Sequence, residues 1–172
     1  MSNNVATIPI FGSADELMLG ILRPFFEGQG VHIGTLFASA LEPPIIIVRR
    51  ERRSGAQAFD SQDDRFIQSA LVSINTITAG VDADEIAEEL QEACRIAIRQ
   101  AVINQTVVPG AGHITRLDNA VLPSRVSDWA TSTGVVQYAS LPKGWVRYES
   151  VYKLLISPPD QALANNRFIT PA

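Results

Sequence analysis

The longest regular pattern in the chain lies at residues 82–103, which read DADEIAEELQEACRIAIRQAVI. Asp82 and Glu85 have the spacing of a capping box, which marks the start of a helix. Acidic residues crowd the first half and Arg95 and Arg99 lie in the second, an order that complements the helix dipole. Apolar side chains recur every three or four residues, as in a helix that packs across a sheet. The expected buried stripe contains Ile86, Leu90, Ala93, Cys94, Ala97, Ile98, Ala101 and Val102.

Three stretches around this helix have strand patterns. Residues 45–48 read IIIV, a β-branched run that is too short for a helix and predicts a buried strand. In residues 70–78 the apolar and polar side chains alternate, so we expect the face with Ser73 and Asn75 to be wet or at an interface. Residues 146–156 alternate in the same way, and shorter strands are plausible at residues 113–117 and 135–139.

A second helix is expected near the N-terminus. Ser13 and Glu16 again have capping-box spacing, and an apolar stripe follows from Leu17 to Phe26. Pro24 should end or bend this helix near Leu22, because proline lacks a backbone donor and clashes with the preceding turn. The order of helix, strands, long helix and strands has no regular βαβ alternation. It predicts an α+β fold, with a mainly antiparallel or mixed β-sheet and helices packed on one face.

The composition is that of one globular domain. The chain has 172 residues, of which 46% are hydrophobic and 19% charged, and its net charge of -4 argues against a general nucleic-acid binder. We expect a single domain at residues 1–158 and a C-terminal tail or arm at residues 159–172, which lack apolar periodicity. The first residues do not have the pattern of a secretory signal, and no apolar run approaches the ~20 residues of a membrane-spanning helix.

No arrangement of residues predicts catalysis. His32 and His113 are the only histidines and lie in separate segments, and the single cysteine, Cys94, falls on the buried stripe. The glycines of residues 108–112 lack the rest of a phosphate-binding loop and predict a turn. Asp60, Asp63 and Asp64 lack the glycine and closing glutamate of a calcium loop. We therefore expect no enzymatic activity, no metal and no cofactor.

The most unusual local feature is a cluster of four arginines directly after the IIIV run: Arg49, Arg50, Arg52 and Arg53. One interpretation is a solvated hairpin tip. A second is a protein interface, in which the arginines pair with acidic groups such as Asp60, Asp63 and Asp64 of a neighbouring subunit, because arginine makes bidentate contacts with carboxylates. Direct DNA recognition is a third.

The whole pattern resembles the tail terminator proteins of long-tailed bacteriophages, particularly those that infect actinobacteria. The resemblance covers residues 13–158. It rests on the capped helix from Ser13, the PIIIVRR strand at residues 44–50, Asp63 and Asp64 before a second strand, the alanine-rich helix from Asp82, and the WVRY opening of a last strand at residue 145.

The resemblance implies a ring, usually of six subunits, that caps the finished tail tube and stops its growth. Its partners would be copies of itself, the tail tube protein and a head-side connector, and DNA would pass through the channel without sequence readout. The implied location is the tail or neck of a virion assembled in the host cytoplasm. A different neck, connector or tube protein, or a small enzyme, remains an alternative.

Overall fold

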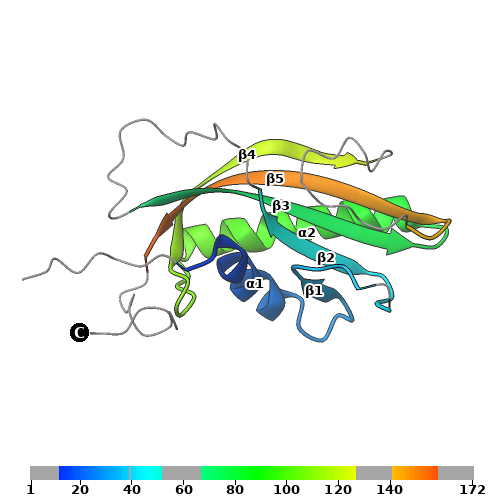
Figure 1. Ribbon diagram of the computed structural model, residues 1–172, viewed down its shortest axis with the longest axis horizontal. Coiled ribbons are helices and arrows are strands. Elements are labelled where there is room, and N and C mark those ends of the chain that lie inside the picture. Colours follow the sequence, from blue (N-terminus) through cyan, green and yellow to red (C-terminus); the bar gives the residue numbers. More distant parts are fainter. Residues whose placement is uncertain (1–11, 39, 52–66, 127–140, 159–172) are drawn as a thin grey trace, which may run out of the picture.

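In the part of the chain that the structure describes, five strands form one mixed sheet, and two helices cover one of its faces (Figure 1). The computed structural model describes residues 12–38, 40–51, 67–126 and 141–158. The elements in chain order are α1 (Ala14–Phe25), β1 (His32–Gly34), β2 (Ile45–Arg50), β3 (Gln68–Ala79), α2 (Ala83–Ile103), β4 (His113–Arg125) and β5 (Trp145–Ser157). The α+β fold expected from the sequence is confirmed.

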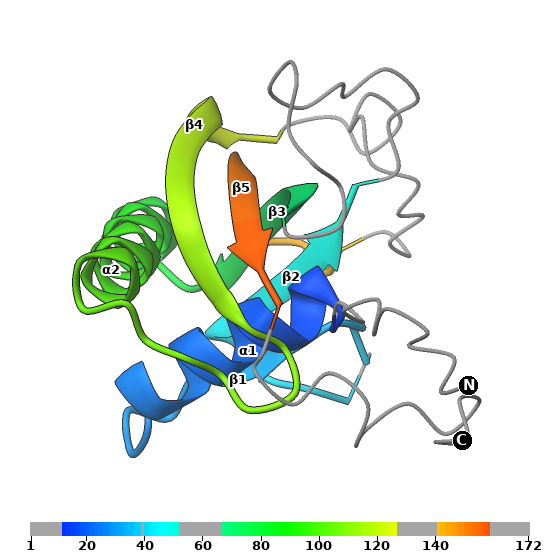
Figure 2. The same cartoon turned by 90° about the vertical axis from the view of Figure 1, so that its left-hand side faces the viewer.

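The strands lie in the order β1-β2-β3-β5-β4. β1 is parallel to β2, and the other neighbours are antiparallel. α1 and α2 form one layer beside the strands when the molecule is viewed from its end (Figure 2). α1 contacts β1, β2 and β3, whereas α2 contacts β3, β5 and β4. The two helices therefore divide one face of the sheet between them.

The main core lies between this face and the helices. Alternate residues of β3 and β5 point into it, among them Val72, Ile74 and Leu154, and they meet Leu17 and Leu90 from the two helices. The alternation predicted for residues 146–156 is confirmed, since Tyr152, Leu154 and Ile156 share the core side. The sheet is thus fixed in register by one continuous apolar face.

The opposite face is also buried in its central part, where the sequence predicted a wet or interface surface. Ser73 and Asn75 are 2% and 1% exposed, and Arg147 from β5 is 1% exposed. A smaller apolar cluster lies on the same face, formed by Ile45, Ile47 and Ile77 with Phe37, Leu41, Leu141 and Trp145 packed against it. The polar side chains of β3 therefore do not mark solvent, and that expectation was wrong.

α1 begins as predicted but ends later. The Ser13 side chain accepts a hydrogen bond from the backbone amide of Asp15 at 3.2 Å. The helix then continues through Pro24 to Phe25, although we expected it to end or bend near Leu22. Pro24 lies in the last turn, where its missing donor costs a single intrahelical bond. The proline is tolerated there because almost no helix follows it.

α2 has the predicted length, but its buried face is rotated from the expected stripe. Ile86 is 38% exposed, whereas Ala87 and the polar Gln91 are buried. Asp82 precedes the helix but makes no side-chain capping bond. Leu90, Cys94, Ala97, Ile98 and Ala101 are buried as expected. The predicted buried face is therefore confirmed in the second half of α2 and wrong at its start.

Two strands differ from the expectation. β1 has three residues and was not predicted, and β4 runs from His113 to Arg125, well beyond the predicted end at residue 117. The strand predicted at 135–139 and the tail predicted at 159–172 lie outside the described residues. Within the described parts of the chain, neither helix is both long and apolar enough to cross a membrane.

Candidate functional site

The first two arginines of the predicted cluster belong to a strand. Arg49 and Arg50 are the last residues of β2 and pair with Ser73 and Val72 of β3. The Nε of Arg49 donates a hydrogen bond to the carbonyl oxygen of Thr35 at 3.1 Å, and Arg49 is half-buried. Arg50 is exposed. The interpretation as a solvated hairpin tip is therefore wrong for Arg49, and Arg50 is the residue of this pair that can meet a partner.

Acidic side chains lie beside this end of β2. The carboxylate of Asp15, in the first turn of α1, accepts a hydrogen bond from the backbone amide of Arg50. Burial raises the pKa of Asp15, although that bond and the charges of Arg50 and Arg49 act in the opposite direction. Glu51 follows Arg50, is 8% exposed, and donates its backbone amide to the carbonyl of Leu71 at 2.8 Å.

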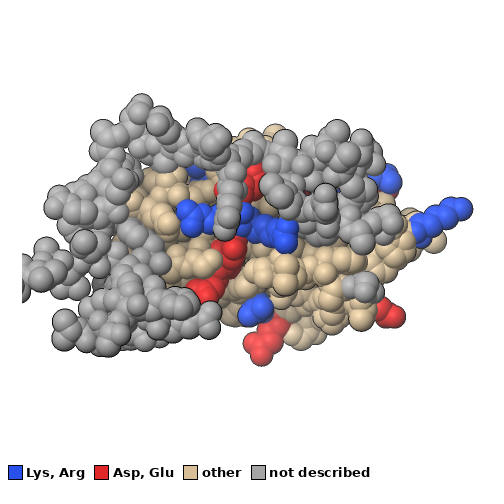
Figure 3. Space-filling view, in the orientation of Figure 1, with Lys and Arg blue, Asp and Glu red and all other residues tan. Residues whose placement is uncertain are grey.

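We call Asp15, Arg49, Arg50 and Glu51 the β2 corner. On the face drawn in Figure 3, basic side chains lie at the centre with acidic ones next to them. Arg50 is the exposed member of the β2 corner and is therefore available for contact.

The structure locates only part of the predicted interface. Arg52, Arg53, Asp60, Asp63 and Asp64 lie outside the described residues, so their predicted contacts stay a prediction. His32 is exposed in β1 and His113 opens β4. Across the described ranges, no three His, Cys, Asp or Glu side chains are placed to share a metal ion.

Cys94 is fully buried on α2, and burial raises the pKa of its thiol to about 12. The predicted turn at residues 108–112 is also present, closed by hydrogen bonds between Val108 and Gly112. Both features are parts of the packed domain: Cys94 lies in the main core, and Val108 packs against it.

A buried polar seam between α2 and the sheet was missed by sequence reasoning. The Gln91 amide donates to the carbonyls of Ile74 and Tyr148 at 3.1 and 3.2 Å and to the Thr76 hydroxyl at 3.2 Å. Its oxygen accepts from Ser150 at 2.7 Å. Both polar atoms of the Gln91 side-chain amide are therefore hydrogen-bonded within the protein, as buried polar groups usually are.

The first turns of α2 carry a second polar group at the edge of this seam. The Tyr148 hydroxyl lies 3.3 Å from Asp84 and 3.2 Å from Glu88, and Asp84 also pairs with Arg125 of β4 at 3.0 Å. Burial and these carboxylates raise the pKa of Tyr148. These contacts tie the start of α2 to the ends of β4 and β5.

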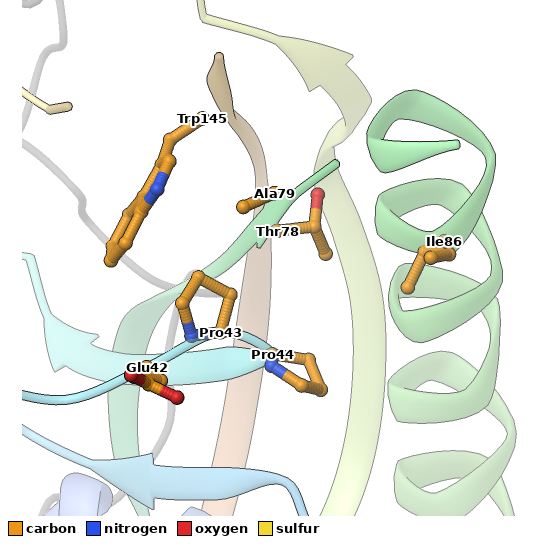
Figure 4. Close-up of a pocket in the computed structure, with 7 residues that line it drawn as sticks. All are labelled: Glu42, Pro43, Pro44, Thr78, Ala79, Ile86 and Trp145. Carbon is orange, nitrogen blue, oxygen red and sulfur yellow. The ribbon is translucent and has the colours of Figure 1, made fainter. Parts of the chain in front are cut away.

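A shallow hollow of about 240 Å³ lies at the same end of the domain. It is lined by Glu42, Pro43, Pro44, Thr78, Ala79, Ile86 and Trp145. Ile86 projects from α2 toward Thr78, and Trp145 lies beyond Ala79 on the other side of the strand end (Figure 4). Glu42 is the one ionisable residue in this described lining, so the hollow is suited to apolar contact rather than to acid–base chemistry.

No protein-family model matches the chain, and no curated protein sequence is significantly similar to it.

Proposed function

We propose that this chain is a structural subunit that assembles with copies of itself into a ring, and that the ring acts as a tail terminator of a long-tailed bacteriophage. The observation that carries the self-assembly part is that four of the eight exposed large apolar side chains in the described residues lie at the ends of α2. Val81 and Ile86 lie at its start, and Ile103 and Val107 lie at and just after its end. Exposed apolar side chains that lie together mark surfaces suited to contact with another protein.

The terminator part of the proposal rests on the resemblance in residues 13–158. The described elements include a helix capped by Ser13, a strand ending in Arg49 and Arg50, the long helix α2, and a last strand that opens at Trp145. In a terminator ring, the β2 corner would offer Arg50 to an acidic surface on a neighbouring subunit or on the tail tube. Such charge pairs set association rate and partner choice more than folding stability.

Two alternatives make different predictions. A tube or other neck protein of the same virion would form an open stack or a different assembly, whereas a terminator forms one closed ring. An enzyme would need a pocket with paired catalytic groups, and the hollow at Trp145 supplies Glu42 alone from its described lining. The self-assembling structural role is thus the function that these residues support best.

Native mass spectrometry and negative-stain electron microscopy of the purified chain test the assembly. We expect one discrete oligomer that does not grow with concentration and has a central channel. An open filament would favour the tube alternative, and a monomer at every concentration would overturn the proposal. A phage that lacks this chain should make tails of abnormal length that fail to join heads, and supplying the chain should restore normal tails.

A further inference from the structure

The two ends of α2 present different apolar surfaces. At its start, the N-end surface consists of Val81, which is fully exposed, Ile86 and the hollow beside it. At its end, the C-end surface consists of Ile103 and Val107, which are 78% and 58% exposed. The N-end surface includes a hollow, and the C-end surface consists of two exposed side chains. They are therefore candidates for partners in the same contact.

Charge separates the two surfaces as well. Six acidic residues and no basic ones lie in residues 82–92, and the exposed Glu42 adds to them at the hollow. Residues 93–117 contain three arginines and no acidic residue. The helix dipole alone favours this order along α2. Two of these arginines are paired within the chain, Arg95 with Glu92 and Arg116 with Asp118, so the exposed Arg99, one turn before Ile103, is the basic side chain of this stretch that can meet a second copy. Arg99 and the acidic side chains around the N-end surface attract each other when two copies meet.

One subunit cannot make this contact with itself. α2 has 21 residues, and at ~1.5 Å per residue its ends are ~30 Å apart. The surfaces can therefore meet only between molecules. Because the two halves of the contact are different, the contact is head-to-tail, and repeated head-to-tail contacts close into a ring or continue as a filament.

We infer that the C-end surface of one copy docks on the N-end surface of the next, with Ile103 and Val107 against Val81, Ile86 and the hollow. This inference rests on the proposed ring-forming function and names the subunit contact. Arg99 faces the acidic side chains of residues 82–92 across this contact and orients the approach.

The β4 edge of the sheet is a weaker place for this contact. The outer edge of β4 pairs with no other strand in the described parts of the chain. However, β4 has register shifts at three positions and contains Pro123, which has no backbone donor. Bulges and proline are features that prevent edge-to-edge pairing. The ends of α2 carry no comparable obstacle.

Two double variants test the contact. Val81→Asp/Ile86→Asp damages the N-end surface, and Ile103→Asp/Val107→Asp damages the C-end surface. All four side chains are exposed, so both variants should fold, which circular dichroism and thermal melting check. Ile96→Asp is the matched control, because Ile96 is 38% exposed on α2 but lies at neither end. If an aspartate variant melts early, the serine version replaces it.

Native mass spectrometry then reads the assembly. We expect the control to keep the wild-type oligomer and each double variant to be a monomer. An equimolar mixture of the two variants should give a dimer and nothing larger, since one intact N-end surface and one intact C-end surface remain. If the wild type forms a ring and either variant keeps it, or if the mixture stays monomeric, the inferred contact is wrong while the proposed function stands. A monomeric wild type overturns the proposed function itself.

Discussion

The Ser150 hydroxyl donates a 2.7 Å hydrogen bond to the side-chain oxygen of Gln91, and both residues are at most 1% exposed. The two residues are 59 positions apart in the chain, so the bond joins the middle of α2 to β5. A buried polar pair of this kind fixes where the helix lies on the sheet, because displacement would leave several polar atoms without partners.

Removing both partners of this pair should destabilise the domain by less than the sum of the two single losses. Ser150→Ala leaves the Gln91 oxygen buried without its donor, and Gln91→Leu removes the whole set of bonds. Each should lower the free energy of unfolding by ~1–3 kcal/mol. The double variant should cost less than the sum of the two. Urea unfolding of the wild type, the two single variants and the double variant measures this coupling. If the two single losses of unfolding free energy add up to the loss in the double variant, the bond between the two side chains does not stabilise the domain.

Gly20→Ala should destabilise the protein although alanine favours helices by ~1 kcal/mol over glycine. A Cβ at position 20 of α1 would lie 2.5 Å from Cγ1 of Val108. The expected loss is ~1–3 kcal/mol of unfolding free energy, from overpacking. Adding Val108→Ala removes the obstructing atoms. The double variant should therefore melt at the same temperature as the Val108→Ala protein or at a higher one.

Leu90→Asp should prevent folding, whereas the neighbouring Glu89→Ala should be nearly silent. Leu90 is 8% exposed and packs in the main core, while Glu89 is exposed. An unpaired buried carboxylate costs several kcal/mol, on the order of the whole stability of a domain. Solubility and cooperative melting provide the measurement. A Leu90→Asp protein that melts like the wild type would show that this face of α2 is not packed.

Cys94 should make the domain less stable at alkaline pH. Burial raises the pKa of its thiol from 9.0 to about 12, so the folded state holds a proton that the unfolded chain releases above pH 9. The free energy of unfolding should therefore fall between pH 9 and 12, by at most ~1.4 kcal/mol per pH unit. Cys94→Ala removes this contribution, while the tyrosines remain in both proteins. Equal alkaline losses in the two proteins would contradict the prediction.

Serine at positions 49, 50, 52 and 53 together should leave the subunit folded but weaken ring formation or docking to the tail tube. Arg49 loses its bond to Thr35, a cost of ~1 kcal/mol, and Arg50 is exposed. Salt should weaken the wild-type association in the same direction. Sedimentation and tail-length measurements provide the readout, with Arg23→Ser as a control at another exposed arginine. Normal tails joined to heads would remove the cluster from the mechanism.

Periodicity predicted the features that depend on local pattern. The α+β class, β2 at the IIIV run, the sidedness of β5 and the second half of α2 follow from spacing alone, because a packed apolar face must repeat with its element. The three residues of β1 are too few to show a period. β4 extends through Asn119, Ala120 and Ser124, whose side chains give no strand pattern.

The candidate surfaces depended on tertiary partners that a linear pattern does not contain. Gln91 is a polar residue that is buried because Ser150, Thr76 and two carbonyls satisfy it. On the same helix, Ile86 is exposed and lines the hollow, although the apolar pattern placed it on the buried face. The arginine cluster was visible in the sequence. The pairing of Arg49 and Arg50 with β3 was not, because the apolar pattern that predicted β2 ends at residue 48.

β5 comes after the other four described strands in the chain, yet it lies between β3 and β4 in the sheet. A nascent chain that has reached Arg125 has made β3 and β4 without the strand that joins them, and Gln91 without its donor Ser150. The apolar faces of α2 and β3 therefore stay partly exposed to solvent until residues 145–157 leave the ribosome. Folding of this domain is therefore a late event in its synthesis, and a chain that stops before Trp145 should be handed to chaperones or degraded rather than enter an assembly.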